Sequence, residues 1–188
     1  MSIATSAQIS LSEFIELPDT KPASELIDGQ IVQKPMPQGE HSRIQWKLST
    51  VINQVAEAHR IACAFPELRC YCGQNVIVPD IAVFSWARIP LTETGRIANR
   101  FEIQPDWIIE ILSPGQSQTL VMAKIFNCLA NGTQLGWLID PSESAILVIS
   151  PDRRVDILMG DSQLPVLAGI KLELTPTVIF SWLELISS

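Results

Sequence analysis

Apolar and polar positions change their period several times along the chain, and each change predicts a new element. Residues 9–17 are compatible with a short helix that ends at Pro18. Asp28 and Gly29 lie between two short apolar runs, a pattern that predicts a β-hairpin turning at this dipeptide. Over residues 40–59 the apolar positions recur at helical spacing while polar residues fill the other faces, which predicts a long amphipathic helix.

The rest of the chain alternates between apolar runs typical of strands and two further helical stretches. The predicted strands cover residues 62–68, 75–84, 107–112, 137–139, 145–149, 155–158 and 170–174. The run 75–84 is either one long strand or a pair broken at Pro79. Helices are predicted at 120–130, with Asn131 and Gly132 as a C-terminal stop, and at 178–185. This mixed order predicts an α/β or α+β fold, with a mixed central β-sheet flanked by helices.

Composition adds a large core and an acidic surface to this picture. Hydrophobic residues make up 47% of the chain and charged residues 18%, which excludes a disordered protein. The mean hydropathy of +0.24 is high for a chain of this size. Either the core is unusually complete or a partner covers some apolar surface, most simply a second copy in a homodimer. The formal net charge of −7 weighs against a basic nucleic-acid-binding surface, although thirteen Lys and Arg residues can still gather on one face.

The termini and the cysteines indicate a cytoplasmic protein. Residues 1–10 lack the basic and apolar parts of a signal peptide, and no apolar run reaches the roughly 18 residues of a membrane span. The chain contains Cys63, Cys70, Cys72 and Cys128, with no second Cys or His pair at zinc spacing. We therefore expect reduced, mostly buried thiols.

Two acids within apolar strands are the strongest candidates for chemistry. Glu110 shares one strand face with Ile108 and Leu112, where a carboxylate is costly to bury unless it is paired or bound to metal. The alternative is a glutamate at a sheet edge that pairs with a nearby arginine. Asp80 is a second lone acid among apolar residues, with the alternative of a turn aspartate after Pro79. Two such carboxylates from neighbouring strands can share Mg²⁺ or Mn²⁺.

Lys124 would complete a site for phosphodiester hydrolysis. It lies on the predicted second long helix, fourteen residues after Glu110. A helix that returns across the sheet could bring its ammonium group over the carboxylates, where it would orient a water molecule or stabilise charge on a phosphate. The alternative is an ordinary exposed helix lysine.

Two further polar residues are weaker candidates. His41 stands at the start of the long helix and could act as a base or contact phosphate, but a histidine there is more often structural. Asp106 forms a second Pro-Asp pair, yet at strand rise it would lie roughly 13 Å from Glu110 on the same face. That separation is too large for the two acids to share one ion.

Six stretches of this chain resemble the Uma-type family of restriction endonucleases, which belongs to the PD-(D/E)XK nuclease superfamily. They are ELIDGQIV, EHSRIQWKL, VPDIAVF, QPDWIIEILSP, AKIFNCLANGTQLGWLIDP and LPVLAGIKLEL. The resemblance runs from about residue 25 to about residue 183, and E-I-L-S-P followed by the lysine helix is its most specific part. It implies a restriction-endonuclease-like core within a single domain that covers residues 1–188.

The resemblance also implies a divalent-metal-dependent endonuclease that hydrolyses phosphodiester bonds, with DNA as the expected partner and Mg²⁺ or Mn²⁺ as the cofactor. Asp80 matches the acid of the PD motif and Glu110 that of the (D/E)XK motif, and both would bind the metal. The lysine that usually stands two residues after the glutamate is Leu112 here, and Lys124 looks like its migrated substitute. Glu25 matches the glutamate of E-L-I-D-G and is a further candidate ligand.

Two further positions can be compared with the family, and two other functions stay open. His41 matches the E-H-S stretch of the family, whereas Cys128 stands where other members often have a tyrosine. The main alternative is a catalytically inactive nuclease-fold protein that serves as a nucleic-acid or protein binding module. The acidic net charge, the high mean hydropathy and the cysteine at position 128 favour this alternative. A transposon-related nuclease that acts with a partner is a third possibility, and the sequence does not separate it from the first.

Overall fold

The computed structural model describes residues 8–185, and positions 1–7 and 186–188 lie outside this description. Most of residues 1–10, in which no signal-peptide pattern was found, lie outside the described residues. The helices along the described chain are α1 (Leu11–Ile15), α2 (Gly39–Ala56), the 3-10 helix η1 (Trp86–Arg88), α3 (Gln118–Ala130) and α4 (Pro176–Ser181). None of them is long and apolar enough to cross a membrane.

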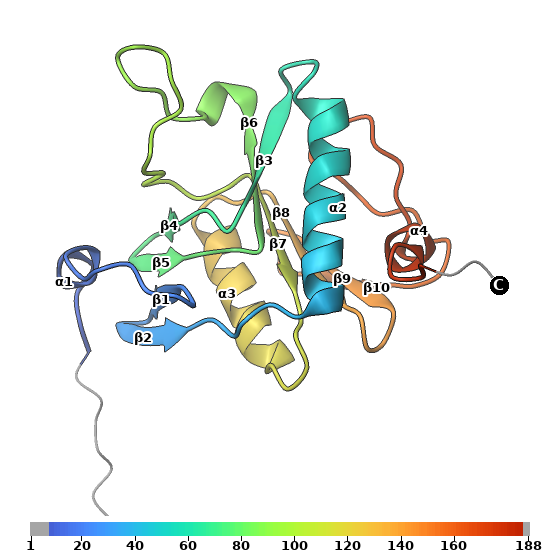
Figure 1. Cartoon of the computed structure of the whole chain (residues 1–188), viewed down its shortest axis with the longest axis horizontal. Helices are drawn as coiled ribbons and strands as arrows, with labels where there is room; N and C mark the ends of the chain where they lie inside the picture. The colour runs from blue at the N-terminus through green and yellow to red at the C-terminus, as the bar shows by residue number, and fades with distance from the viewer. Residues whose placement is uncertain (1–7, 186–188) are drawn as a thin grey trace, which may run out of the picture.

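The strands form two sheets of different size (Figure 1). The larger sheet has the order β10-β9-β8-β7-β6-β3 and the smaller has the order β2-β1-β5-β4. The strands are β1 (Ser24–Ile27), β2 (Gln30–Gln33), β3 (Ala62–Pro66), β4 (Cys70–Cys72), β5 (Asn75–Ile77), β6 (Ile81–Ser85), β7 (Trp107–Ile111), β8 (Leu135–Asp140), β9 (Ala145–Ile149) and β10 (Val155–Leu158). Within the larger sheet β7 and β8 pair in parallel, whereas its other ladders are antiparallel. The predicted mixed sheet flanked by helices is therefore confirmed.

Helices cover both faces of the larger sheet, as Figure 1 shows for α2 and α3. On one face Leu48 of α2 belongs to the same apolar cluster as Ile109 of β7. On the other face Ile125 of α3 shares a cluster with Ile108. Because successive side chains of a strand point to opposite faces, Glu110 lies on the face that α3 covers. The strand that carries Glu110 is thus buried on both sides.

The helix α3 connects the parallel strands β7 and β8 and lies close against the second of them. A Cβ atom added at Gly136 of β8 would collide with the side chain of Ile125 on α3. Glycine therefore permits the short distance between helix and strand, and the residue before Ile125 in the chain is Lys124. This close packing holds the helix lysine near the sheet.

The smaller sheet begins with the hairpin predicted at Asp28 and Gly29. Both residues have positive φ, 50° and 78°, as a two-residue turn between right-twisted strands requires. The strand β1 also pairs with β5, where Leu26 lies opposite Val76. This sheet carries Glu25 on β1 and meets α3 through a disulfide, as described below.

Three sequence predictions need correction or refinement. The run 75–84 is a pair of strands broken at Pro79, and its two halves belong to different sheets. The segment 170–174 is not a strand, since it pairs with no other strand of the described chain. Its residues Ile170 and Leu174 nevertheless bury their side chains in the core. The short strand β4 was not predicted, since three residues are too few to show a period.

Candidate functional site

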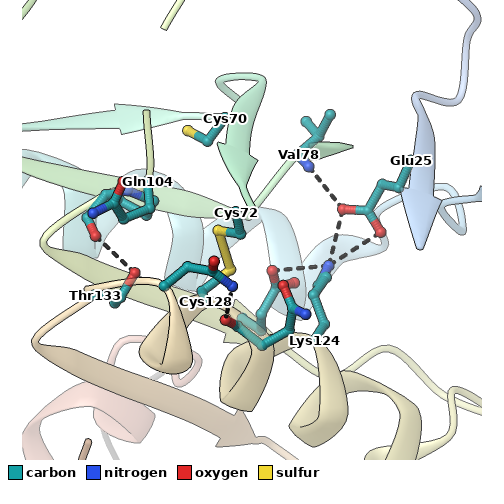
Figure 2. Close-up of a disulfide and its surroundings, with 12 residues drawn as sticks. Glu25, Cys70, Cys72, Val78, Gln104, Lys124, Cys128 and Thr133 are labelled. Carbon is teal, nitrogen blue, oxygen red and sulfur yellow. Dashed lines mark hydrogen bonds and ion pairs between the residues drawn. A yellow bond between two sulfur atoms is a disulfide. The ribbon is translucent and has the colours of Figure 1, made fainter. Parts of the chain in front are cut away.

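Lys124 places its ammonium group between two buried carboxylates (Figure 2). Its Nζ lies 3.0 and 3.2 Å from the two carboxylate oxygens of Glu25 and 2.9 Å from Oε1 of Glu110. All three residues are at most 5% exposed. A buried ammonium group is stable only when it is paired, and here it has two partners. Burial works to lower the pKa of Lys124, but Glu110 and Glu25 outweigh it and raise that pKa above its usual value.

Three separate elements bring these residues together. Glu25 comes from β1 of the smaller sheet, and its Oε1 also accepts a 2.7 Å hydrogen bond from the backbone N–H of Val78. Glu110 comes from β7 of the larger sheet, and Lys124 from α3, which lies over the same face. The structure therefore brings together Glu110 and Lys124, two of the three residues predicted to converge, with Glu25, which was predicted as an additional candidate.

Asp80 is held immediately beside this group. Its Oδ1 lies 2.6 Å from Nζ of Lys34, and its Oδ2 lies 3.0 Å from Nε2 of His41. The same Oδ2 accepts a 2.7 Å hydrogen bond from the backbone N–H of Ile111, the residue after Glu110. Asp80 and Glu110 are therefore linked through one peptide unit of β7.

The partners of Asp80 control its ionisation. Burial works to raise the pKa of Asp80, but the hydrogen bond from His41 and the charge of Lys34 lower it well below its usual value. Asp80 is 2% exposed, so these partners replace the water that would otherwise solvate the carboxylate. The histidine predicted as an additional site residue is thus part of the site as a hydrogen-bond partner of Asp80.

Two members of this cluster were not found from the sequence. Lys34, just after β2, donates from Nζ to Asp80 and also to the carbonyl oxygen of Val78, at 2.7 Å. Gln45 donates from Nε2 to the carbonyl oxygen of Asp80, at 2.9 Å. Gln45 lies four residues after His41, so a shared helix face was the available signal for it. For Lys34 the sequence gives no such signal, since it follows an exposed strand and precedes a proline.

Glu110 is the least satisfied acid of the cluster. It is 1% exposed, and apart from the ion pair with Lys124 its Oε1 has no hydrogen-bond partner among the described residues. Burial raises the pKa of Glu110 to about 7, against the opposing charge of Lys124. The nearby carboxylate of Asp80 contributes to this rise in the pKa of Glu110. An additional positive charge beside Glu110 would therefore stabilise its ionised form.

The carboxylates of this cluster suit a divalent ion that keeps water ligands better than an ion coordinated by protein side chains alone. Among residues 8–185, no three His, Cys, Asp or Glu side chains are grouped so that they could hold a metal ion by themselves. Mg²⁺ usually retains several water molecules and takes one or two carboxylates together with substrate phosphates. Asp80 and Glu110 are the two carboxylates that could take part in such a site, while Lys34, His41 and the backbone N–H of Ile111 engage both oxygens of Asp80.

Asp106 lies outside this cluster and has a structural role. Its two carboxylate oxygens accept hydrogen bonds from the backbone N–H of Ser85, from Arg88 and from Gln134, all within 2.7 Å. Burial works to raise the pKa of Asp106, but the hydrogen bonds from Ser85 and Arg88 lower it below its usual value. These contacts join the start of β7 to the chain around it.

A disulfide next to the cluster contradicts the expectation of four reduced thiols. Cys72 of β4 and Cys128 of α3 are bonded to each other, with their Cα atoms 5.0 Å apart (Figure 2). Cys63 and Cys70 are free and buried. Spacing could not reveal this pair, because its members are 56 residues apart and come together only when the smaller sheet meets α3. Cys128 stands four residues after Lys124, so the bond joins the sheet that carries Glu25 to the helix that carries the lysine.

Two cavities reach the cluster. One, of about 150 Å³, is lined by Glu25, Lys34 and Lys124. The other, of about 520 Å³, is lined by His41 and extends along the ends of β7 and β8. Both are lined by Gln116, which therefore lies between them. The cluster is buried but bordered by space on two sides.

The comparisons with known proteins identify the family and the fold. The family model Uma2, described as "Putative restriction endonuclease", matches residues 11–178. The structure is similar to the crystal structure of "a putative nuclease belonging to DUF820" from Anabaena variabilis ATCC 29413, with a TM-score of 0.91 and 53% sequence identity. That similarity covers 94% of this chain and 99% of the other. Among curated proteins none matches. The family resemblance found in the sequence is confirmed.

Proposed function

We propose that this chain, which belongs to the Uma2 family, is a divalent-metal-dependent endonuclease that hydrolyses phosphodiester bonds of DNA. The observation that supports the proposal is the position of Asp80 just before β6, Glu110 on β7 and Lys124 on α3, which lie in one cluster beside two cavities. The structural neighbour named as a nuclease supports the reaction class.

The residues of the cluster have separate roles in this proposal. Asp80 and Glu110 would hold Mg²⁺ or Mn²⁺, which when bound makes a coordinated water more acidic and offsets negative charge on the phosphate. Lys34 and His41 keep Asp80 ionised and fix the direction of its oxygens. Glu25 holds the ammonium group of Lys124 until a substrate phosphate competes for it.

Lys124 is the group that would contact the reacting phosphate. Its raised pKa keeps it charged at neutral pH. Nζ carries three donors, so it can keep its contact with Glu110 while donating to a phosphoryl oxygen. In a water-poor site such a donor stabilises developing negative charge more strongly than it would in bulk solvent.

The alternative is a catalytically inactive binding module on the same fold. It is favoured by the fact that both lysines of the cluster already pair with carboxylates and are at most 10% exposed at the side chain. However, the Lys34–Asp80 pair and the pairs of Lys124 with Glu25 and Glu110 are electrostatically coupled. The charge of Asp80 acts on the pKa of Lys124, and that of Lys34 acts on the pKa of Glu110.

Cleavage of defined DNA substrates tests the proposal directly. The purified chain is incubated with single- and double-stranded DNA in Mg²⁺, Mn²⁺ or a chelator, beside Glu110→Gln, Lys124→Met and the exposed control Glu143→Gln. We expect cleavage only with metal, with each cluster variant reduced by about a hundredfold or more and the control unchanged. No cleavage of any DNA by the unmutated chain, or full activity of Glu110→Gln, would contradict the proposal.

A further inference from the structure

The larger cavity lies at the carboxyl ends of the two parallel strands. Its walls are the loop after β7, the first turn of α2 and the turn after β8. Crevices at the carboxyl ends of parallel strands are frequent ligand sites in α/β proteins. The cavity also contains His41, the partner of Asp80, so a molecule in it would lie next to the proposed reaction site.

Several polar groups on these walls have no partner in the described part of the chain. Ser113 is 5% exposed and His41 is 7% exposed, and in each a buried polar atom, Oγ and Nδ1 respectively, makes no hydrogen bond there. Buried polar atoms without partners are uncommon in native proteins and suggest a missing ligand or water. Gln38 and Gln118 also line the cavity with side-chain amides for which we find no hydrogen bond to the described residues. The walls thus offer hydrogen-bond donors and acceptors to a bound molecule.

The charges on the walls disfavour a phosphate. Neither lysine nor arginine occurs among the residues that line this cavity, whereas Glu40 and Asp140 do. Asp140 uses Oδ1 to accept from the backbone and hydroxyl of Ser142 and from the backbone N–H of Glu143, and none of its side-chain hydrogen bonds within residues 8–185 uses Oδ2. Leu112 and Pro141 supply apolar surface beside these groups. This combination suits a flat, uncharged molecule that carries N–H donors.

We propose that this cavity binds the base and sugar of one unpaired nucleotide next to the scissile phosphate, and that it prefers adenine and cytosine to thymine. The inference rests on the proposed nuclease function and specifies the substrate for it. A glutamine amide can pair with the amino group and ring nitrogen of adenine, and a carboxylate can accept from the amino group of cytosine. Thymine has no exocyclic amino group to offer to either.

The same geometry defines the form of nucleic acid that fits. A base within a duplex has its pairing edge occupied, so it must leave the stack before it can enter a cavity. That step costs least in single-stranded or frayed DNA. The chain should therefore cleave single strands or frayed ends in preference to an intact duplex.

Nucleoside binding without metal tests the cavity separately from catalysis. An NMR chemical-shift titration of the isotope-labelled chain in a chelator uses adenosine, cytidine, thymidine and inorganic phosphate as probes. We expect adenosine and cytidine to bind about fivefold or more tightly than thymidine, with shifts at Ser113 and Gln118. Equal affinity for the three nucleosides, or binding of phosphate in their place, overturns the proposal.

Two variants and one control connect that binding to the cavity. Gln118→Leu should weaken adenosine binding about fivefold or more, and Ser113→Ala should weaken it to a smaller extent. Gln163→Leu replaces an exposed glutamine that does not line the cavity, so it should leave adenosine affinity unchanged. Unchanged adenosine affinity in both cavity variants overturns the assignment.

The outcome of this titration is independent of the cleavage assay. If the chain cleaves DNA but binds no nucleoside, the cavity proposal fails while the nuclease proposal stands. If it binds nucleosides with the expected preference but never cleaves, the cavity assignment stands as a binding site and the nuclease proposal fails.

Discussion

Asp80 shows how one buried acid depends on neighbours that the sequence does not reveal. Its two oxygens contact Lys34, His41 and the backbone N–H of Ile111, and its own carbonyl oxygen contacts Gln45. The sequence identified Asp80 because an acid among apolar residues is unusual. It could not identify Lys34, since a lysine after an exposed strand has nothing to distinguish it until the chain is folded.

Removal of the Lys34 charge should destabilise the fold. Lys34→Met leaves Asp80 buried without its cation, which typically costs about 3 kcal/mol or more when a buried ion pair loses one member. Urea unfolding measures the change, with the exposed Lys171→Met as the matched control and an expected change of about 0.5 kcal/mol or less. Equal stability of the two variants would show that the Lys34–Asp80 pair is not formed in solution.

Asp106 should make stability depend on pH in the acid range. Its pKa in the fold is lowered from the ordinary value of 3.8, so its contribution is complete above that value and is lost as the pH falls through the folded pKa. The difference in unfolding free energy between the unmutated chain and Asp106→Asn should therefore be largest at neutral pH and shrink as the pH falls below about 4. Urea unfolding at a series of pH values measures this, with the exposed Asp161→Asn as control. A difference that grows toward acid pH would contradict the assignment.

At the scale of elements, long periodic segments were predictable and short or irregular ones were not. Helix α2 has eighteen residues and a sustained apolar face, so its period was visible and its position agrees with the prediction. The strand β4 has three residues, too few to show a period, although it pairs with β5 across a short turn. The false strand at 170–174 had the right apolar spacing, but its side chains fill the core as an irregular segment.

The bond between Cys72 and Cys128 should hold the smaller sheet against α3. Thiol titration of the denatured, unreduced chain should give two free thiols per molecule, and four after reduction. Closing a loop of 56 residues is worth about 4 kcal/mol in the chain-entropy account, so reduction should lower the unfolding free energy by up to this amount. Four free thiols before reduction would show that the bond does not form.

At the scale of the whole molecule, the fold and the acids were predictable because the family pattern extends over most of the chain. The family model matches residues 11–178, and the position of Asp80, Glu110 and Lys124 in one cluster agrees with the expectation from the resemblance. The disulfide and Lys34 were not predictable, because both depend on how the smaller sheet meets the larger one. The single domain, the homodimer and the cytoplasmic location stay predictions.

Binding of Mn²⁺ tests the central claim that Asp80 and Glu110 together form a divalent-metal site. Electron paramagnetic resonance can follow free Mn²⁺ as it is added to the chain in the presence of a single-stranded oligonucleotide with non-hydrolysable linkages. We expect one bound ion per chain in the unmutated protein, with the affinity reduced about tenfold or more in Asp80→Asn and in Glu110→Gln. If the unmutated chain binds no Mn²⁺, or if both variants bind it as tightly, these acids are not a metal site and the account is wrong.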